Sequence, residues 1–341
     1  MKIIKYFFEF IFIIFIFLIF KIIGYKNASN FGEVIGKKIG PFFRSNTKIE
    51  NNLENSNIGN SKEDRKLIIN IFLIFKIIGY KNASNLGEII GKKIGPFFRS
   101  NTKIENNLEN SNIGNTKEDR KLIINNMWGN YGRILSEYLY LKQFRKNKLS
   151  KFIEIEGENY LNEIKKNDDQ VVFISGHFNN FELMAMEIEK AGINLCAIYR
   201  PLNNPFLNVI MESIRKNYIC KNQIKKGKSG TRELLNLFKK KFSVALMIDQ
   251  RVSEGEPIKL FNHPAKTTTI PAQLVKKYGC SVVPVYIERV EKYHFKLSFN
   301  KPIKFDNNFS LEQISLELNK ILEKMILKNP DQWIWSHDRW K

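Results

Sequence analysis

The sequence predicts an α/β fold with a mainly parallel central sheet flanked by helices, preceded by an N-terminal transmembrane helix. From residue 171 onward, short apolar runs that suit buried strands alternate with segments of helical periodicity. Hydrophobic residues make up 43% of the 341-residue chain, which is enough to fill one sizeable core. An unbroken apolar run at residues 10–20 adds the membrane-spanning element.

The first 25 residues predict a membrane anchor. Residues 6–25 carry only Glu9 and Lys21 as charges, and about twenty helical residues at roughly 1.5 Å each span the roughly 30 Å core of a bilayer. A cleaved signal peptide is the competing interpretation, but residues 21–26 are bulky and basic and offer no small-residue cleavage site. The Lys/Arg-rich segment that follows favours a cytoplasmic position for the rest of the chain.

Residues 16–70 and 71–125 are two copies of one 55-residue segment. They differ only at Phe31/Leu86, Val34/Ile89 and Ser61/Thr116. Solenoids need three or more repeats with atypical ends, so we interpret the pair as a recent in-frame duplication.

The duplication sets the predicted organisation: an anchor at 1–25, the tandem copies, and an α/β domain at 126–341. We expect the second copy, which is continuous with that domain, to make the native packing. It also repeats an apolar stretch, residues 71–78, which is too short to predict a span and is expected along the membrane surface.

Residues 126–341 predict a regular alternation of helices and strands. Apolar residues at helical spacing predict helices at 127–144, 181–191, 205–216, 231–240, 270–278 and 311–327. Short apolar runs predict strands at 171–175, 195–199, 242–248, 281–288 and 294–299. Ligands of such sheets bind beyond the carboxyl ends of the strands, so we expect the functional site there.

Composition limits the possible partners and cofactors. The net charge of +21 points to an anionic partner, although Lys-rich background composition accounts for part of it. The three cysteines, Cys196, Cys220 and Cys280, form no CxxC pair, so neither disulfides nor a thiolate zinc site is predicted. His263, His294 and His337 are not at metal-ligand spacing, and nothing in the sequence calls for a metal or a cofactor.

Residues 176–182 follow a predicted strand and open a predicted helix. His177 and Glu182 would lie about 140° apart on one regular helix. They meet only if His177 lies in the turn and Glu182 in the first helical turn, with Asn179 or Asn180 as the cap. A carboxylate would then hold the imidazole as a general base. A structural or solvated histidine is the alternative interpretation of this pair.

An ordered series of short motifs surrounds this pair. It comprises Trp128-Gly129-Asn130-Tyr131-Gly132-Arg133 with Glu137, Gly176-His177 to Glu182, Tyr199-Arg200-Pro201 with Asn204-Pro205, Arg215, Asp249-Gln250, Phe261 with Thr267-Thr268-Thr269, Pro284, and Trp335-Ser336-His337 with Arg339. The series resembles the late acyltransferases of lipid A biosynthesis, the lauroyl and myristoyl transferases. The resemblance covers roughly residues 71–341 and the anchor.

This resemblance implies a glycerolipid-acyltransferase-like enzyme of the inner membrane. Such an enzyme takes an acyl chain from acyl carrier protein and esterifies a hydroxyl of an anionic lipid A precursor, without a covalent enzyme intermediate. The resemblance implies that His177 is the general base and that Glu182 orients it. It further implies that Arg215 holds a phosphate or stabilises oxyanion charge, and that Asp249 belongs to the site.

Substrate binding is assigned to residues around these motifs, namely Asn180, Tyr199, Arg200 and Arg232. A basic rim would steer the acidic carrier protein and the phosphorylated lipid, although a solvated loop explains the same residues. The candidates for this rim are Lys225, Lys226, Lys228 and Arg232. Trp333, Trp335 and Trp340 either rest at lipid headgroups or, for the first two, pack against the sheet.

Two alternatives to a lipid A acceptor stay open. An acyltransferase for another membrane lipid would use the same residue pair, although glycerophosphate acyltransferases more typically carry Asp at the position of Glu182. A membrane-tethered nucleic-acid-binding protein would need basic residues interleaved with exposed aromatics, and no such module is visible. We therefore expect no nucleic-acid partner.

Overall fold

The computed structural model describes residues 62–99, 101–202 and 205–340. The chain divides into two compact units, residues 1–80 with 202–212 and residues 81–201 with 213–341. The anchor expected at residues 1–25, and the first repeat copy up to residue 61, lie outside the described residues. Within the described ranges, no helix is both long and apolar enough to cross a bilayer.

A seven-stranded sheet forms the centre of the second unit, in the order β1-β9-β8-β2-β5-β3-β4. All neighbouring strands are parallel except β8 and β9. This confirms the predicted α/β class with a largely parallel sheet. The strands are β1 (Ile153–Glu156), β2 (Val171–Ser175), β3 (Leu195–Tyr199), β4 (Asn222–Lys225), β5 (Ser243–Met247), β8 (Ser281–Glu291) and β9 (His294–Phe299), and β6 (Glu256–Leu260) and β7 (His263–Thr267) form a separate hairpin.

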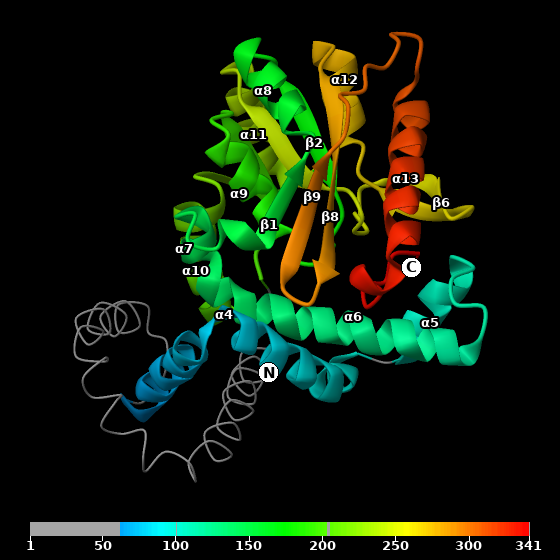
Figure 1. Ribbon diagram of the computed structural model, residues 1–341. Coiled ribbons are helices and arrows are strands. Elements are labelled where there is room, and N and C mark those ends of the chain that lie inside the picture. Colours follow the sequence, from blue (N-terminus) through cyan, green and yellow to red (C-terminus); the bar gives the residue numbers. More distant parts are fainter. Residues whose placement is uncertain (1–61, 100, 203–204, 341) are drawn as a thin grey trace, which may run out of the picture. The chain divides into compact units, whose positions relative to one another are not determined.

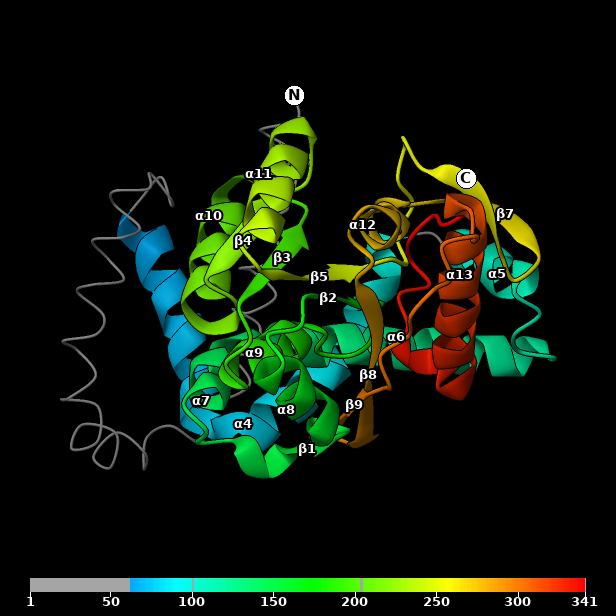
Figure 2. The same ribbon diagram turned by 90° about the horizontal axis from the view of Figure 1, so that it is seen from above.

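Helices flank this sheet, as predicted. Helix α8 packs on β9, α9 on β3, α11 on β4 and α12 on β8. Figure 2 shows α8 and α9 on one side of β8, with α12 and α13 on the other. The helices are α4 (Lys62–Phe98), α5 (Asn101–Asn110), α6 (Lys117–Glu137), α7 (Leu141–Arg145), α8 (Glu158–Lys166), α9 (Glu182–Lys190), α10 (Pro205–Ile214), α11 (Lys228–Lys239), α12 (Ile270–Tyr278) and α13 (Leu311–Lys328).

Helix α6 crosses the edge of the sheet at which the β8–β9 hairpin turns (Figure 1). Its N-terminus is closed by a capping box between Thr116 and Asp119. The C-terminal part of α4, from the second repeat copy, packs closely against it through glycines. A Cβ on Gly91 would lie 2.1 Å from the Trp128 carbonyl oxygen, and one on Gly132 would lie 1.8 Å from the Gly87 carbonyl oxygen. Only glycine allows the two backbones to approach this closely.

Several elements differ from the sequence prediction. The hairpin β6–β7 and the short strands β1 and β4 were not predicted, because they lack continuous apolar runs. The helix predicted at 205–216 ends at Ile214 and continues as a π-helical turn, Arg215–Ile219. Such turns are rare and often mark functional sites.

Candidate active site

Sheet topology brings His177 and Asp249 together. Strands β2 and β5 are parallel neighbours in which Ser175 pairs with Met247. His177 and Asp249 each lie two residues beyond this pair, so both leave the sheet at its carboxyl edge. This is the edge at which ligands of parallel sheets bind.

Asp249 holds His177 through two hydrogen bonds. The His177 backbone N–H donates to Asp249 Oδ2 (2.7 Å), and His177 Nδ1 lies 2.8 Å from Asp249 Oδ1. The indole N–H of Trp333 also donates to Oδ2 (2.8 Å). A carboxylate at Nδ1 fixes the tautomer with the proton on Nδ1, which leaves the Nε2 lone pair as the basic site. Gln250 Nε2 lies 3.4 Å from this Nε2.

Asp249 remains ionised although it is fully buried. Burial alone would raise its pKa, but the charge of His177 and the hydrogen bonds from His177 and Trp333 outweigh burial and hold the pKa below its usual value. The His177 side chain is 19% exposed. The pair therefore combines an anchored anion with an imidazole that a substrate can reach.

A second imidazole, that of His337, lies close to this pair and stays neutral. Burial lowers the pKa of His337 to about 4, although the charge of Asp249 acts in the opposite direction. Its Nε2 accepts a hydrogen bond from the Arg251 backbone N–H (2.8 Å), as a neutral ring nitrogen can. His337 thus supports the segment that follows Asp249 and Gln250.

The pairing of Glu182 with His177 was wrong. Glu182 Oε1 accepts hydrogen bonds from Arg215 Nε (2.8 Å) and Nη2 (2.6 Å) and from the Tyr138 hydroxyl. Glu182 opens α9 and meets the π-helical turn at Arg215, whereas the preceding turn carries His177 toward β5. The carboxylate on His177 is Asp249, which is distant in sequence but adjacent in the sheet.

Arg215 is locked into this second cluster. Burial acts to lower the pKa of Arg215, but the charge of Glu182 and the hydrogen bonds to Glu182 and Tyr138 outweigh it and raise the pKa. Burial and the charge of Glu182 raise the pKa of Tyr138, so its hydroxyl stays protonated and donates. The Arg215 guanidinium also lies over the Tyr199 ring, 5.6 Å from the centroid.

The proposed caps of α9 were also wrong. Phe181 precedes the helix without a side-chain cap. The Asn179 side chain donates to the Ile287 carbonyl oxygen (3.2 Å) and Gln332 Oε1 (2.5 Å), and Asn180 donates to Glu137 (3.2 Å). Asn179 has φ of 42°, which asparagine tolerates better than most residues. The two amides thus fasten the His177 turn to the protein behind it.

The residues assigned to substrate binding lie in different places. Asn180 is fully buried and Tyr199 is 8% exposed, so both lie inside the protein beside charged clusters. Arg200 and Arg232 are exposed, as are Lys225 and Lys226 of the proposed basic rim. A substrate contact for these residues remains a prediction.

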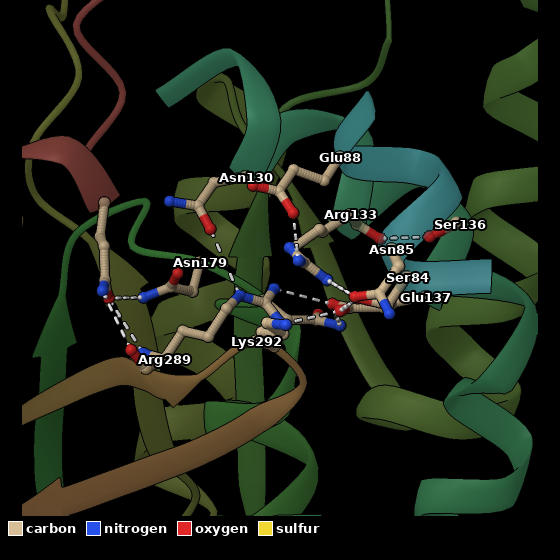
Figure 3. Close-up of polar contacts among 12 residues, drawn as sticks. Ser84, Asn85, Glu88, Asn130, Arg133, Ser136, Glu137, Asn179, Arg289 and Lys292 are labelled. Carbon is tan, nitrogen blue, oxygen red and sulfur yellow. Dashed lines mark hydrogen bonds and ion pairs between the residues drawn. The ribbon is translucent and has the colours of Figure 1, made fainter. Parts of the chain in front are cut away.

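A buried polar cluster around Glu137 contacts the turn that follows His177 through Asn180, and Figure 3 shows the side chains around it. Glu137 is fully buried and accepts hydrogen bonds from Ser84 Oγ (2.8 Å) and from Arg289 Nη1 (2.8 Å) and Nη2 (3.1 Å), besides that from Asn180. Arg133 donates to Ser84 Oγ (2.8 Å) from the opposite side. We call these five residues the Glu137 cluster. It joins α4, α6 and β8 to the turn that carries His177.

The C-terminal segment, residues 330–340, contacts the site through Trp333. Trp333 and Trp335 are buried, with ring centroids 4.6 Å apart, which favours the packing interpretation of these tryptophans. Trp333 donates to Asp249, whereas Trp335 donates to the Pro330 carbonyl oxygen (2.6 Å). Asn107 of α5 donates to the carbonyl oxygens of Trp335 (2.8 Å) and His337 (2.7 Å). Sequence reasoning missed the contact of Trp333 with Asp249, because nothing local signals a bond between residues so far apart.

The described ranges hold no group of three or more His, Cys, Asp or Glu residues suited to a metal ion. The three cysteines are buried and unbridged. His177, held by Asp249, has the geometry of a positioned base, and Arg215, held by Glu182, is a fixed cation.

Comparison with known proteins places the chain in a family. A family described as bacterial lipid A biosynthesis acyltransferase matches residues 65–341. The chain belongs to this family. The match to the acyltransferase family includes His177, Asp249, the Glu137 cluster and the C-terminal segment, but nearly all of the first repeat copy lies outside it.

Individual relatives agree with this membership. The chain is 25% identical over 265 residues to the lipid A biosynthesis palmitoleoyltransferase of Escherichia coli K12, covering 75% of this chain and 84% of the relative. It is 23% identical over 270 residues to the lipid A biosynthesis lauroyltransferase of the same organism, covering 77% and 86%. A lipid A biosynthesis acyltransferase of Haemophilus influenzae is 23% identical over 202 residues, covering 57% and 62%.

Proposed function

We propose that this chain transfers a fatty acyl group from the thioester of acyl carrier protein to a hydroxyl of a lipid A precursor, with His177 as general base. Membership of the lipid A acyltransferase family supports the reaction class and the acceptor. The observation that supports the base is the contact of His177 Nδ1 with the buried Asp249 carboxylate, at 2.8 Å. That contact places the ring proton on Nδ1 and leaves the lone pair of Nε2 as the basic site.

The chemistry follows from this tautomer. His177 Nε2 takes the proton of the acceptor hydroxyl as its oxygen attacks the thioester carbonyl carbon. Asp249 stabilises the imidazolium that forms. The C–S bond of the tetrahedral intermediate then breaks, and the imidazolium returns the proton to the departing sulfur. The products are the ester and the free thiol of the carrier, and no covalent bond to the protein forms.

Arg215 is proposed to stabilise the negative charge that develops on the thioester oxygen. Its bonds to Glu182 use Nε and Nη2, which fixes the plane of the guanidinium. A fixed cation costs no reorganisation when the charge appears. Glu182 thus acts through Arg215 in this proposal, and His177 depends on Asp249 instead.

The donor and the location are part of the same proposal. Acyl carrier proteins are acidic, and the exposed Lys225, Lys226 and Arg232 provide positive charge that would steer one toward the enzyme. The apolar residues 6–25 support an anchor in the inner membrane with the catalytic domain on its cytoplasmic side.

The test is acyl transfer from radiolabelled acyl carrier protein to a Kdo-bearing lipid A precursor, in membranes that contain the wild type, His177→Ala or His263→Ala. His263 is exposed on β7, so His263→Ala is a matched control that also removes a histidine side chain. We expect His177→Ala to lose about 10²- to 10⁴-fold of the rate, the contribution of a positioned base, and His263→Ala to match the wild type.

Two results would contradict the proposal. Equal rates for His177→Ala and the wild type would exclude His177 as the base. Label that enters another membrane lipid, and not the lipid A precursor, would keep the base and replace the acceptor.

A further inference from the structure

The second repeat copy binds the catalytic domain through a defined set of contacts. The docking surface consists of α6 from Trp128 to Glu137 together with residues 335–338. The repeat side contributes close glycine contacts, hydrogen bonds to Glu137 and Arg133, and hydrogen bonds to the C-terminal segment. These contacts come from Ser84, Gly87, Glu88, Gly91, Arg99 and Asn107.

The first copy carries the same residues in the same order. The counterparts, each 55 positions earlier, are Ser29, Gly32, Glu33, Gly36, Arg44 and Asn52. No side chain is missing from this set, and the spacing between its members is unchanged. The sequence therefore holds two segments with the same contact residues for one docking surface.

The three positions at which the copies differ lie where a change costs little. Ile89 is 52% exposed, so its counterpart valine loses little buried area. Leu86 is half-buried, and its counterpart phenylalanine is also apolar. Thr116 caps α6 through its hydroxyl, and the counterpart serine caps helices equally well. The residue types that contact the docking surface from the second copy therefore all recur in the first copy.

We propose that the docking surface accepts either repeat copy, so that residues 29–52 replace residues 84–107 when the second copy is damaged. In the intact chain the second copy is favoured, because its connection to α6 spans only residues 108–116. Seating the first copy lengthens that connection to residues 53–116. Loop closure disfavours it by roughly 20-fold, from the three-halves power of the loop length. A lesion that weakens binding of the second copy by more than this factor makes the first copy the favoured occupant of the docking surface.

Four full-length chains test the exchange, through thermal unfolding in detergent. They are the wild type, Gly32→Val/Gly36→Val, Gly87→Val/Gly91→Val, and the combination of all four substitutions. A Cβ on Gly87 or Gly91 would lie 2.4 or 2.1 Å from a backbone oxygen of α6, so these valines exclude the second copy from the docking surface. The Gly32/Gly36 chain is the matched control, since it carries the same changes in the other copy.

We expect the Gly32→Val/Gly36→Val chain to unfold within about 2 °C of the wild type, since it keeps the second copy in place. The Gly87→Val/Gly91→Val chain should unfold roughly 4–7 °C below the wild type, and the quadruple variant well below both. The interval is the roughly 20-fold loop cost, about 1.8 kcal/mol, at roughly 2–4 °C of Tm per kcal/mol. A Gly87/Gly91 variant as unstable as the quadruple variant would overturn the proposal, because the first copy would then not bind. A quadruple variant as stable as the wild type would also overturn it, because docking would not depend on these contacts.

Discussion

Two fully buried carboxylates, Asp249 and Glu137, lie on either side of the same turn and have different partners. Asp249 is bound by an imidazole and an indole N–H, whereas Glu137 is bound by a guanidinium, a hydroxyl and an amide. An imidazole exchanges its proton near neutral pH and a guanidinium does not. The partner therefore separates the two roles: in the proposed mechanism Asp249 supports proton transfer, whereas Glu137 joins α4, α6 and β8 to the turn.

The largest expected effect separates these roles directly. Asp249→Asn replaces the carboxylate at His177 Nδ1 by an amide, which no longer selects the reactive tautomer or stabilises the imidazolium. We expect acyl transfer to fall by about 10²- to 10⁴-fold. The folded state should persist, as circular dichroism would show. Asp306→Asn, at an exposed position, is the matched control. A fall of less than about threefold would assign the orientation of His177 to another group.

Glu137→Gln should act on the stability of the fold, which the melting temperature measures. It leaves the Arg289 guanidinium buried without a counter-charge, and loss of one partner of a buried ion pair costs about 3–5 kcal/mol. The expected fall in Tm is roughly 6–20 °C for a domain of this size. Glu163→Gln, on the exposed face of α8, should change Tm by less than about 2 °C. An unchanged Tm for Glu137→Gln would show that the Glu137 cluster does not stabilise the fold.

A smaller effect is expected from the two tryptophans. Trp333→Phe and Trp335→Phe remove similar volume from one buried pair, but only the first removes a hydrogen bond to Asp249. Such a bond to a charged group contributes about 1.5–3 kcal/mol, so Trp333→Phe should slow transfer roughly 10- to 100-fold.

The pH dependence distinguishes positioning from packing in this pair. Without the indole donor the pKa of Asp249 rises, so the acid-side loss of activity should move to higher pH in Trp333→Phe. The profile of Trp335→Phe should keep the wild-type shape. Parallel profiles for both variants would limit Trp333 to packing.

The smallest effect concerns His337 and the pH dependence of stability. The folded-state pKa of about 4 lies below the usual 6.5, so the unfolded chain binds this proton first as pH falls. The stabilisation is complete above about pH 6.5 and is lost as pH falls toward about 4. The pKa of Asp249 lies below 3.8, outside this window. His337→Gln should flatten the unfolding free energy between these pH values, and the exposed His263→Gln should not.

The sheet and one half of the site could be predicted from the sequence. The buried strand at 171–175 and the run at 242–248 are both apolar, and each is followed by a polar residue, His177 or Asp249. No local sequence pattern encodes the order of strands in the sheet, so the adjacency of β2 and β5 could not be predicted. Glu182 was predicted as the partner because it is near in sequence and because the family resemblance implied the pair.

The Glu137 cluster shows a different limit of sequence reasoning. Glu137 and Arg289 lie far apart in the chain, and each alone resembles a solvated charge. Their pairing depends on α6 crossing the edge of the sheet at the β8–β9 turn. The hairpin β6–β7 was missed for a local reason: its buried positions, such as Ile258 and Ala265, alternate with charged or proline residues.

The hydrogen bond from Trp333 has a consequence for the order of biosynthesis. Residues 330–340 follow every strand of the sheet and the last long helix in the chain. The sheet and the His177 turn can therefore form before residues 330–340 have been synthesised. Asp249 lacks its indole donor until these residues leave the ribosome. A nascent chain can therefore form the sheet before the Asp249 carboxylate has its full set of hydrogen bonds.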